Sequence, residues 1–269
     1  MPRPCTTSRS PSPPRTREAQ FDERWAFVAK KEEDRDRSDP ADDLEGDCRG
    51  HVALDPEHRP VVVVAPGKRT AENVATTVDG FRRRTGGRPT SLITTDEYAP
   101  YREAMPEAYG ETVTPPRTGR RGRPRKPCKV APAGLLHATI HETRREGRVV
   151  KVEPRLVFGT EAALRAALQT SASSRAVDTS FVERRNGTDR NRDAREVRKA
   201  YSFSKSWTVH RLITYFTPYV HDFCRPVRTP ADRDEAGRPR ERTPAMAAGL
   251  TGHVWSIEEW LTMPAVHRS

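Results

Sequence analysis

Three acidic side chains that lie far apart in the sequence have neighbours that suit ligands of divalent cations. Asp22 lies within the apolar segment FDERWAFV, Asp96 ends the segment SLITTD, and Glu183 lies in a polar segment with helical spacing. Phosphoryl transfer by two metal ions needs such hard oxygen ligands, held by rigid elements around cations about 3.5–4 Å apart. The chain has 37 acidic residues, so residue type alone does not single out this trio.

The segment around Glu183 adds two polar side chains on the same helical face. Asn186 and Arg190 follow Glu183 by three and seven positions, and a helix brings residues with these spacings to one side. A carboxylate with an amide and a guanidinium above it would suit a metal-bound phosphate. The alternative is a solvated, charged helix, because further arginines, among them Arg184, surround this face.

The elements that would position these acids follow from hydrophobic pattern and turn residues. Alternating apolar residues from Phe21 predict a strand, two β-rich runs around the turn PEHR predict a hairpin, and Thr70 can cap a helix. This order predicts an α/β fold with a meander of three strands and a fourth strand added by a crossover. The expected elements of this half are strands at 21–28, 50–55, 61–66 and 91–96, a helix at 71–84, and a solvated acidic loop at 32–47.

The second half is less regular. We expect an insertion at about 115–177 that contains a hairpin turning at Glu146–Gly147, and a helix that starts at Thr160. A polar helix over 178–199 and an apolar helix up to Cys224 should follow, the latter of the kind that packs on a sheet. The predicted organisation is a disordered basic arm at 1–20, a catalytic domain at 21–224, and a Pro/Arg linker with a short C-terminal element at 225–269.

Composition favours a polyanionic partner. The net charge is +11, with 48 basic residues, and only 34% of the residues are hydrophobic. The four cysteines form no CxxC pair, which argues against a zinc knuckle and against a secreted disulfide framework. No apolar run approaches the ~20 residues of a membrane span. We expect a cytoplasmic, nucleoid-associated protein.

A basic segment in the middle of the chain could contact DNA directly. Its sequence PPRTGRRGRPRKPCKV resembles the Arg-Gly-Arg-Pro core of AT-hook peptides, which lay arginines in a narrow minor groove. The alternative is a generic basic linker, and either version would bind phosphates. The candidate contacts are Arg120, Arg121, Arg123, Arg125 and Lys126.

The segments around the three acids resemble the catalytic motifs of insertion-sequence-one family transposases. In that family an Asp-Glu-x-Trp strand, a Thr-Asp strand end followed by Tyr, and a Glu-Arg-x-Asn helix carry the acids. The segment SFSKS at 202–206 is also similar to the family, and the resemblance extends over about 21–224. The matching residues are Asp22-Glu23-x-Trp25, Thr95-Asp96 with Tyr98 and Tyr101, and Glu183-Arg184-x-Asn186.

The resemblance implies an RNase H-like fold: a mixed five-stranded sheet flanked by helices, with an inserted hairpin and disordered basic and acidic segments. It also implies that Asp22, Asp96 and Glu183 hold Mg²⁺ or Mn²⁺ and catalyse DNA strand cleavage and transfer in the transposition of an insertion sequence. The implied partners are double-stranded DNA, both transposon ends and target, and further copies of the chain in a homo-oligomer on that DNA.

The chain also departs from the family. Relatives carry zinc-binding cysteines and a helix-turn-helix before the first catalytic strand, which here is expected at Phe21. We therefore expect the catalytic half alone, with a separate N-terminal end-binding protein or fusion. Two alternatives remain: an inactive or truncated remnant that only binds DNA, and an RNase H-like nuclease.

Overall fold

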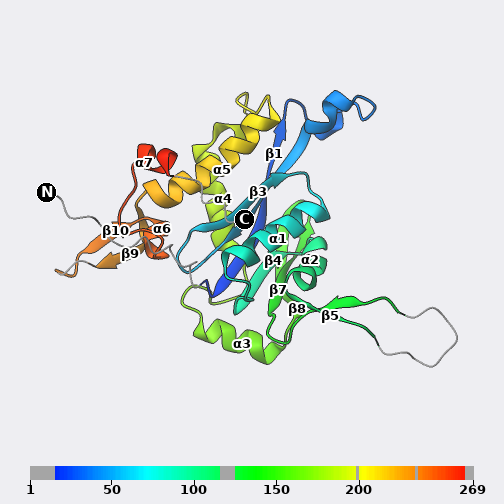
Figure 1. Ribbon diagram of the computed structural model, residues 1–269, viewed down its shortest axis with the longest axis vertical. Helices are drawn as coiled ribbons and strands as arrows, with labels where there is room; N and C mark the ends of the chain where they lie inside the picture. Colours follow the sequence, from blue (N-terminus) through cyan, green and yellow to red (C-terminus); the bar gives the residue numbers. More distant parts are fainter. Residues whose placement is uncertain (1–15, 116–124, 198–199, 234–235, 264–269) are drawn as a thin grey trace.

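A mixed six-stranded sheet forms the centre of the molecule (Figure 1). The computed structural model describes residues 16–115, 125–197, 200–233 and 236–263. Strands β3, β2 and β1 pair antiparallel, β4 and β7 continue parallel to β1, and β8 returns antiparallel to β7. The strands, in their order across the sheet, are β3 (Val61–Gly67), β2 (Gly46–Leu54), β1 (Glu18–Val28), β4 (Leu92–Asp96), β7 (His137–Arg145) and β8 (Arg148–Phe158).

This architecture confirms the mixed α/β sheet flanked by helices and corrects its details. The expected count of five strands is wrong, because β8 pairs with β7 along its length and adds a sixth strand. The predicted hairpin turn is confirmed: Glu146 and Gly147 have φ values of 50° and 77°, as a tight two-residue turn between twisted strands requires. The hairpin is not inserted beside the sheet, since β7 pairs directly with β4.

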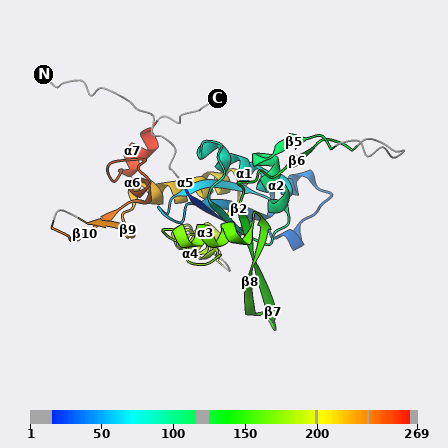
Figure 2. The same cartoon turned by 90° about the horizontal axis from the view of Figure 1, so that it is seen from below.

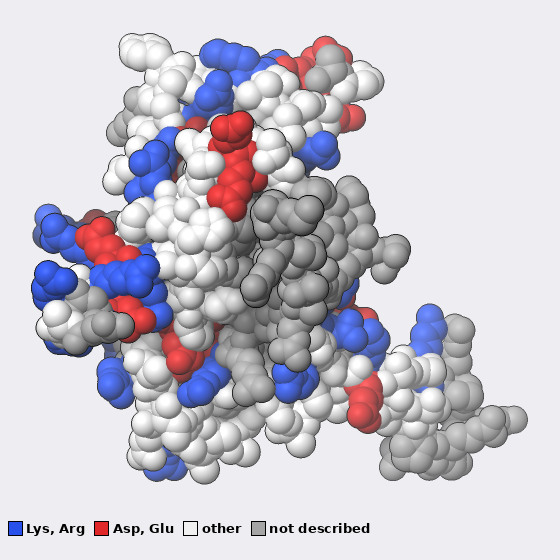
Figure 3. All heavy atoms as spheres, turned by 60° about the vertical axis from the view of Figure 1, so that its left-hand side comes forward, with Lys and Arg blue, Asp and Glu red and all other residues white. Residues whose placement is uncertain are grey.

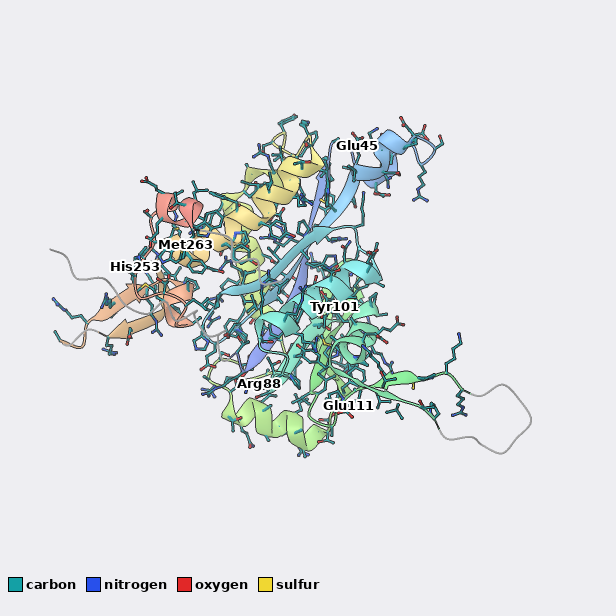
Figure 4. All side chains as sticks on the ribbon, in the orientation of Figure 1. Glu45, Arg88, Tyr101, Glu111, His253 and Met263 are labelled. Carbon is teal, nitrogen blue, oxygen red and sulfur yellow. The ribbon has the colours of Figure 1, made fainter. Side chains whose placement is uncertain are left out.

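One face of the sheet is covered by α1 (Ala71–Arg84) and α2 (Pro100–Tyr109), as Figures 1 and 2 show. The predicted start of α1 is confirmed, because the Thr70 hydroxyl accepts a hydrogen bond from the Asn73 amide at 3.3 Å. Phe21 of β1 packs edge-on against Phe81 and Tyr101, with ring centroids 5.2 and 5.8 Å away. Tyr101 is fully enclosed in this layer (Figure 4).

The opposite face carries α3 (Glu161–Thr170) and α4 (Ser180–Arg192) (Figure 2), and α5 (Trp207–Cys224) contacts α4. Helix α4 packs along β1, and α5 packs on β3. The expected helix over 178–199 is too long, because α4 ends at Arg192. The Asp193 carboxylate accepts a hydrogen bond from the Arg195 amide at 2.9 Å and starts a separate turn, η3 (Ala194–Glu196).

The ends of the expected domain also shift. Strand β1 begins at Glu18 rather than Phe21, so the last residues of the expected disordered arm are ordered, whereas residues 1–15 lie outside the described part. The expected Pro/Arg linker contains a hairpin, β9 (Val227–Arg233) with β10 (Pro239–Arg242). Two short helices, α6 (Pro244–Ala247) and α7 (Ile257–Thr262), follow, and Trp260 packs edge-on against Phe216 of α5.

The two charged loops differ from each other. The acidic loop contains two short turns, η1 (Glu32–Asp34) and η2 (Pro40–Leu44), and it is not wholly solvated, since Asp42 is buried and pairs with Lys30 at 2.8 Å. The basic segment is flanked by a small hairpin of β5 (Glu111–Val113) and β6 (Cys128–Val130), at the right of Figure 1, and its residues 116–124 lie outside the described part. Among the described residues, no helix combines the length and apolarity needed to cross a bilayer.

Candidate active site

Strand β1 fixes the position of α4 through the side chain of Gln20. Its Oε1 accepts hydrogen bonds from the backbone amides of Phe181 and Val182, at 3.0 and 3.1 Å. Helix N-termini leave such amides without partners, and the N-cap residue Thr179 makes no capping bond here. A side chain from the central strand therefore caps the helix and sets its register along the sheet.

Two residues further along β1, Asp22 meets the same helix. The Asn186 side-chain amide donates a 2.7 Å hydrogen bond to Oδ2 of Asp22. Glu183 lies one helical turn before Asn186, between the two points at which β1 contacts α4. The structure thus brings the strand and the helix together in the way that the spacing of Asp22, Glu183 and Asn186 requires.

Asp96 reaches the neighbourhood of Asp22 from the adjacent parallel strand. The pairing of β1 with β4 matches Gln20 with Thr94, and the same register continued by two residues sets Asp22 beside Asp96. Side chains alternate along a strand, so Asp96 points to the same face as Leu92, which packs on the α3 side of the sheet. Asp96 Oδ1 also accepts a 3.2 Å hydrogen bond from the Tyr98 amide.

The acids influence one another electrostatically. Burial raises the pKa of Asp22 to about 6, against the lowering effect of hydrogen bonds from the Glu23 backbone and Asn186, and the charges of Asp96 and Glu183 raise it further. Burial also raises the pKa of Asp96, while the Tyr98 amide and the charge of Arg69 lower it. Burial disfavours the ionised form of these carboxylates, and a bound cation would offset that cost.

Glu183 is the least engaged of the three. Its side chain is exposed, and its Oε1 accepts a 2.5 Å hydrogen bond from the Thr179 hydroxyl, along the helix rather than toward Asp22. Within the described ranges, no three acidic, His or Cys side chains already lie close enough to hold a single metal ion. Exposed side chains change rotamer in picoseconds to nanoseconds, so Glu183 is free to turn once a ligand competes with Thr179.

The donor set fits Mg²⁺ or Mn²⁺. All three acids offer hard carboxylate oxygens, which these cations prefer. Close by, the Oδ1 of Asn186 is buried without a hydrogen-bond partner, and the residue as a whole is only 1% exposed. An orphaned buried oxygen is costly, and a cation or its bound water would satisfy it.

A second acidic group near Asp96 was missed by the sequence analysis. Glu23 is buried on the other face of β1, and its Oε2 accepts a 2.7 Å hydrogen bond from Nε of Arg69. The same guanidinium lies 3.6 Å from Asp96 Oδ2 and stacks over the Tyr98 ring at 4.1 Å. Across the strand pair, burial lowers the pKa of His51 to about 4, so this neighbour is neutral. Arg69 therefore partly neutralises Asp96, and nothing in its own spacing signals this role.

A buried ion network continues the line of β1 contacts beyond Asp22. Arg24 pairs with Asp189 and lies 3.3 Å from Glu196, and all three side chains are at most 3% exposed. Asp189 also accepts a 3.0 Å bond from Arg185, which in turn pairs with Asp222 of α5 at 2.5 Å. The network fixes α4 and α5 on the sheet, so these groups serve the site by positioning.

The residues predicted to contact DNA have different surroundings. Asn186 is buried on Asp22, Arg190 is half-buried, and Arg184 is exposed. Arg125 and Lys126 are exposed at the base of the basic loop, whereas Arg120, Arg121 and Arg123 lie outside the described residues. On the face drawn in Figure 3, basic side chains form separate groups mixed with acidic ones.

Comparison with protein-family models, with curated proteins and with solved structures found no match to this chain. The resemblance to insertion-sequence-one transposases therefore rests on the motifs themselves. The functional proposal rests on the residues of the site and on their geometry.

Proposed function

We propose that this chain is a DNA transposase of RNase H-like fold that cleaves and joins DNA strands with the help of Mg²⁺ or Mn²⁺. One observation carries the proposal. Asp22 of the central strand β1 is hydrogen-bonded to Asn186 of α4, and the end of β4, which carries Asp96, lies beside β1. The three-stranded meander followed by a parallel crossover strand also agrees with the fold that the motifs imply.

The three acids divide the work by position. Asp22, on the central strand, would be shared by the cations, Asp96 would flank it, and Glu183 would complete the site from the helix. When bound there, the ions would supply Lewis-acid activation of an attacking oxygen, of water or of a DNA 3′-hydroxyl, and would stabilise charge on the leaving 3′-oxygen.

Around these ligands, other residues of the chain orient the acids. Asn186 holds the Asp22 carboxylate by one oxygen, and Gln20 holds the helix that carries Glu183. The charge of Arg69 lowers the pKa of Asp96 against the burial that raises it, and Arg69 also stacks on Tyr98, whose amide bonds to Asp96. The partners would be double-stranded DNA and, because two ends must be processed together, further copies of the chain.

The test is a DNA strand assay with labelled duplex oligonucleotides and a supercoiled plasmid, in Mg²⁺ or Mn²⁺. The variants are Asp96→Ala and, as a control on an exposed acid of α2, Glu103→Gln. The proposal predicts nicking and joining of 3′-ends by the wild type and the control, with a loss of at least about 10²-fold in Asp96→Ala. Equal DNA binding by all three proteins without nicking would support a DNA-binding remnant. Nicking without joining would support a nuclease.

A further inference from the structure

A cavity of about 260 Å³ lies away from the three acids, on the flank of α4 that faces the end of β2 and the start of β9. Its walls include Arg59, Phe181, Arg184 and Thr188, together with Thr229 from β9. Residues 181, 184 and 188 follow each other at three- and four-residue spacing, so they form one face of the helix. Glu183 lies on a neighbouring face and does not line the cavity.

The cavity holds two arginine side chains that lack acidic partners. In the part of the chain that the structure describes, no carboxylate lies within 4.0 Å of the guanidinium nitrogens of Arg59 or Arg184. Arg185 in the same wall differs, because Asp189 and Asp222 neutralise it. Asp55, the acid whose charge acts on Arg59, is already hydrogen-bonded by His58 at 2.8 Å.

The two positive charges line the same cavity. Burial lowers the pKa of Arg59, and the charge of Arg184 lowers it further. The Arg59 guanidinium also stacks over the Phe181 ring, 3.7 Å from its centroid, so its plane is fixed while its edge stays available. Two like charges at a half-enclosed position are unfavourable unless an anion joins them.

The backbone of Arg59 supports the same conclusion independently. Its φ of 75° lies in the left-handed region of backbone conformation, which residues other than glycine and asparagine rarely adopt. The turn is held by bonds from the Arg59 amide to the Asp55 carbonyl at 2.8 Å and from the Asp55 amide to the Pro60 carbonyl at 3.1 Å. Such backbone strain is commonly kept where a side chain must be presented at a defined place.

We propose that this cavity binds a phosphate group between the guanidinium groups of Arg59 and Arg184. Arginine forks match phosphate oxygens with paired hydrogen bonds, which makes phosphate the anion that this arrangement fits. We assign this phosphate to the DNA backbone, away from the cleaved bond, and that assignment rests on the proposed function. A free phosphate or a phosphorylated small molecule would satisfy the same chemistry.

The experiment measures duplex-DNA binding by fluorescence anisotropy over a range of salt, in EDTA, so that no strand chemistry takes part. Arg184→Gln is the main variant because its side chain is exposed and unbonded in the described structure, and Arg165→Gln on the exposed face of α3 is the control. Each lost phosphate contact should reduce the slope of log Kd against log salt by about 0.9. The predicted slope falls by about this amount in Arg184→Gln and in Arg59→Gln, and is unchanged in Arg59→Lys and in the control.

A second arm separates the sources. Inorganic phosphate is added at constant ionic strength, and the melting temperatures of the wild type and of Arg184→Gln are compared. A phosphate-dependent rise only in the wild type, with equal DNA slopes, supports the cavity as a site for free phosphate. Equal slopes in all proteins, together with equal responses to phosphate, would overturn the proposal.

The outcome can be read independently of catalysis. A wild-type protein that fails to nick DNA, while the salt slope falls in Arg184→Gln, would keep the phosphate site and remove the enzymatic proposal. Conversely, a chain that joins DNA strands with no effect of Arg59 or Arg184 on the slope or on phosphate binding would keep the function and reject the cavity.

Discussion

Asn186 donates a hydrogen bond of 2.7 Å to Oδ2 of Asp22 and thereby ties α4 to the central strand at the middle of the acid site. The bond lowers the pKa of Asp22 against the burial that raises it. The oxygen of the same side-chain amide, Oδ1, is buried without a hydrogen-bond partner. Asn186 is thus a positioning residue, whose effect should be visible in the titration of the acid that it holds.

Replacing Asn186 with Ala should raise the pKa of Asp22 above its value of about 6, because a hydrogen bond that favours the ionised form is lost. The pH dependence of DNA nicking measures this: we expect its acidic limb to move to higher pH by roughly one unit, since a bond to a charged group contributes about 1.5–3 kcal/mol. Asn191→Ala, an exposed position of the same helix, should leave the limb in place. Identical limbs for both variants would show that Asn186 does not act through Asp22.

Asp22→Asn should stabilise the protein at neutral pH and do little in acid. The folded-state pKa of about 6 lies above the ordinary value of 3.8, so the protonated form is the one that fits the fold. The contribution of wild-type Asp22 is therefore fully present below about pH 4 and is lost as the pH rises through about 6. The shift of about two pKa units corresponds to at most ~3 kcal/mol.

Urea unfolding between pH 4 and 8 measures this difference. The gain in unfolding free energy of Asp22→Asn over the wild type should grow up to about pH 6 and then level off. Added Mg²⁺ should narrow the difference, because it stabilises only the protein with the charged carboxylate. A gain that is the same at every pH would contradict the assigned cause.

Gln20→Ala should destabilise the first turn of α4. The substitution leaves the Phe181 and Val182 amides without their acceptor, and Val182 is fully buried. We expect a loss of about 1–3 kcal/mol in the free energy of unfolding, with faster hydrogen exchange at these two amides. Gln169→Ala, at an exposed position of α3, provides the control and should cost less than about 0.5 kcal/mol. Equal losses would mean that Gln20 is not the cap of the helix.

Arg24→Leu should be among the most destabilising single substitutions in the chain. It leaves Glu196 as a buried charge without its arginine partner and leaves Asp189 with Arg185 alone, and breaking such a buried pair costs about 3–5 kcal/mol. The exposed pair of Arg83 with Asp79 on α1 offers a matched comparison, for which Arg83→Leu should cost less than about 1 kcal/mol. Denaturant unfolding of the two variants measures these losses in unfolding free energy. Similar losses in both would reject a structural role for the buried ion network.

Local signals in the sequence were sufficient where one element determines the outcome. The cap at Thr70, the turn at Glu146–Gly147 and the apolar pattern of α5 each specify a local structure, and all three predictions are confirmed. The end of α4 was misjudged because Asp193 redirects the chain through a single side-chain bond, which helical periodicity does not reveal. The same holds for the sixth strand, since β-pairing partners depend on the whole sheet.

The acids of the site could be selected from their motifs, but their supporting residues could not. Every second position of β1 from Gln20 to Arg24 is polar. In a buried strand this alternation places the polar side chains on one face, and it is the signal that could have identified Gln20 and Arg24 as supporting residues. Arg69 reaches Glu23 and Asp96 from a loop far along the chain, and no spacing rule predicts such a contact. The Glu183 side chain bonds to Thr179 in this structure, and the proposed metal site requires it to turn toward Asp22.

The most direct test of the central claim is the binding of Mn²⁺, followed by electron paramagnetic resonance of the free ion, to the wild type, Asp22→Asn, Asp96→Asn and Glu183→Gln. Glu103→Gln serves as the control. We predict that the wild type and the control bind Mn²⁺ and that each of the three other substitutions weakens binding by roughly tenfold or more, as expected when one ligand of a shared site is lost. Binding that is absent from the wild type, or that is the same in all five proteins, would contradict the account.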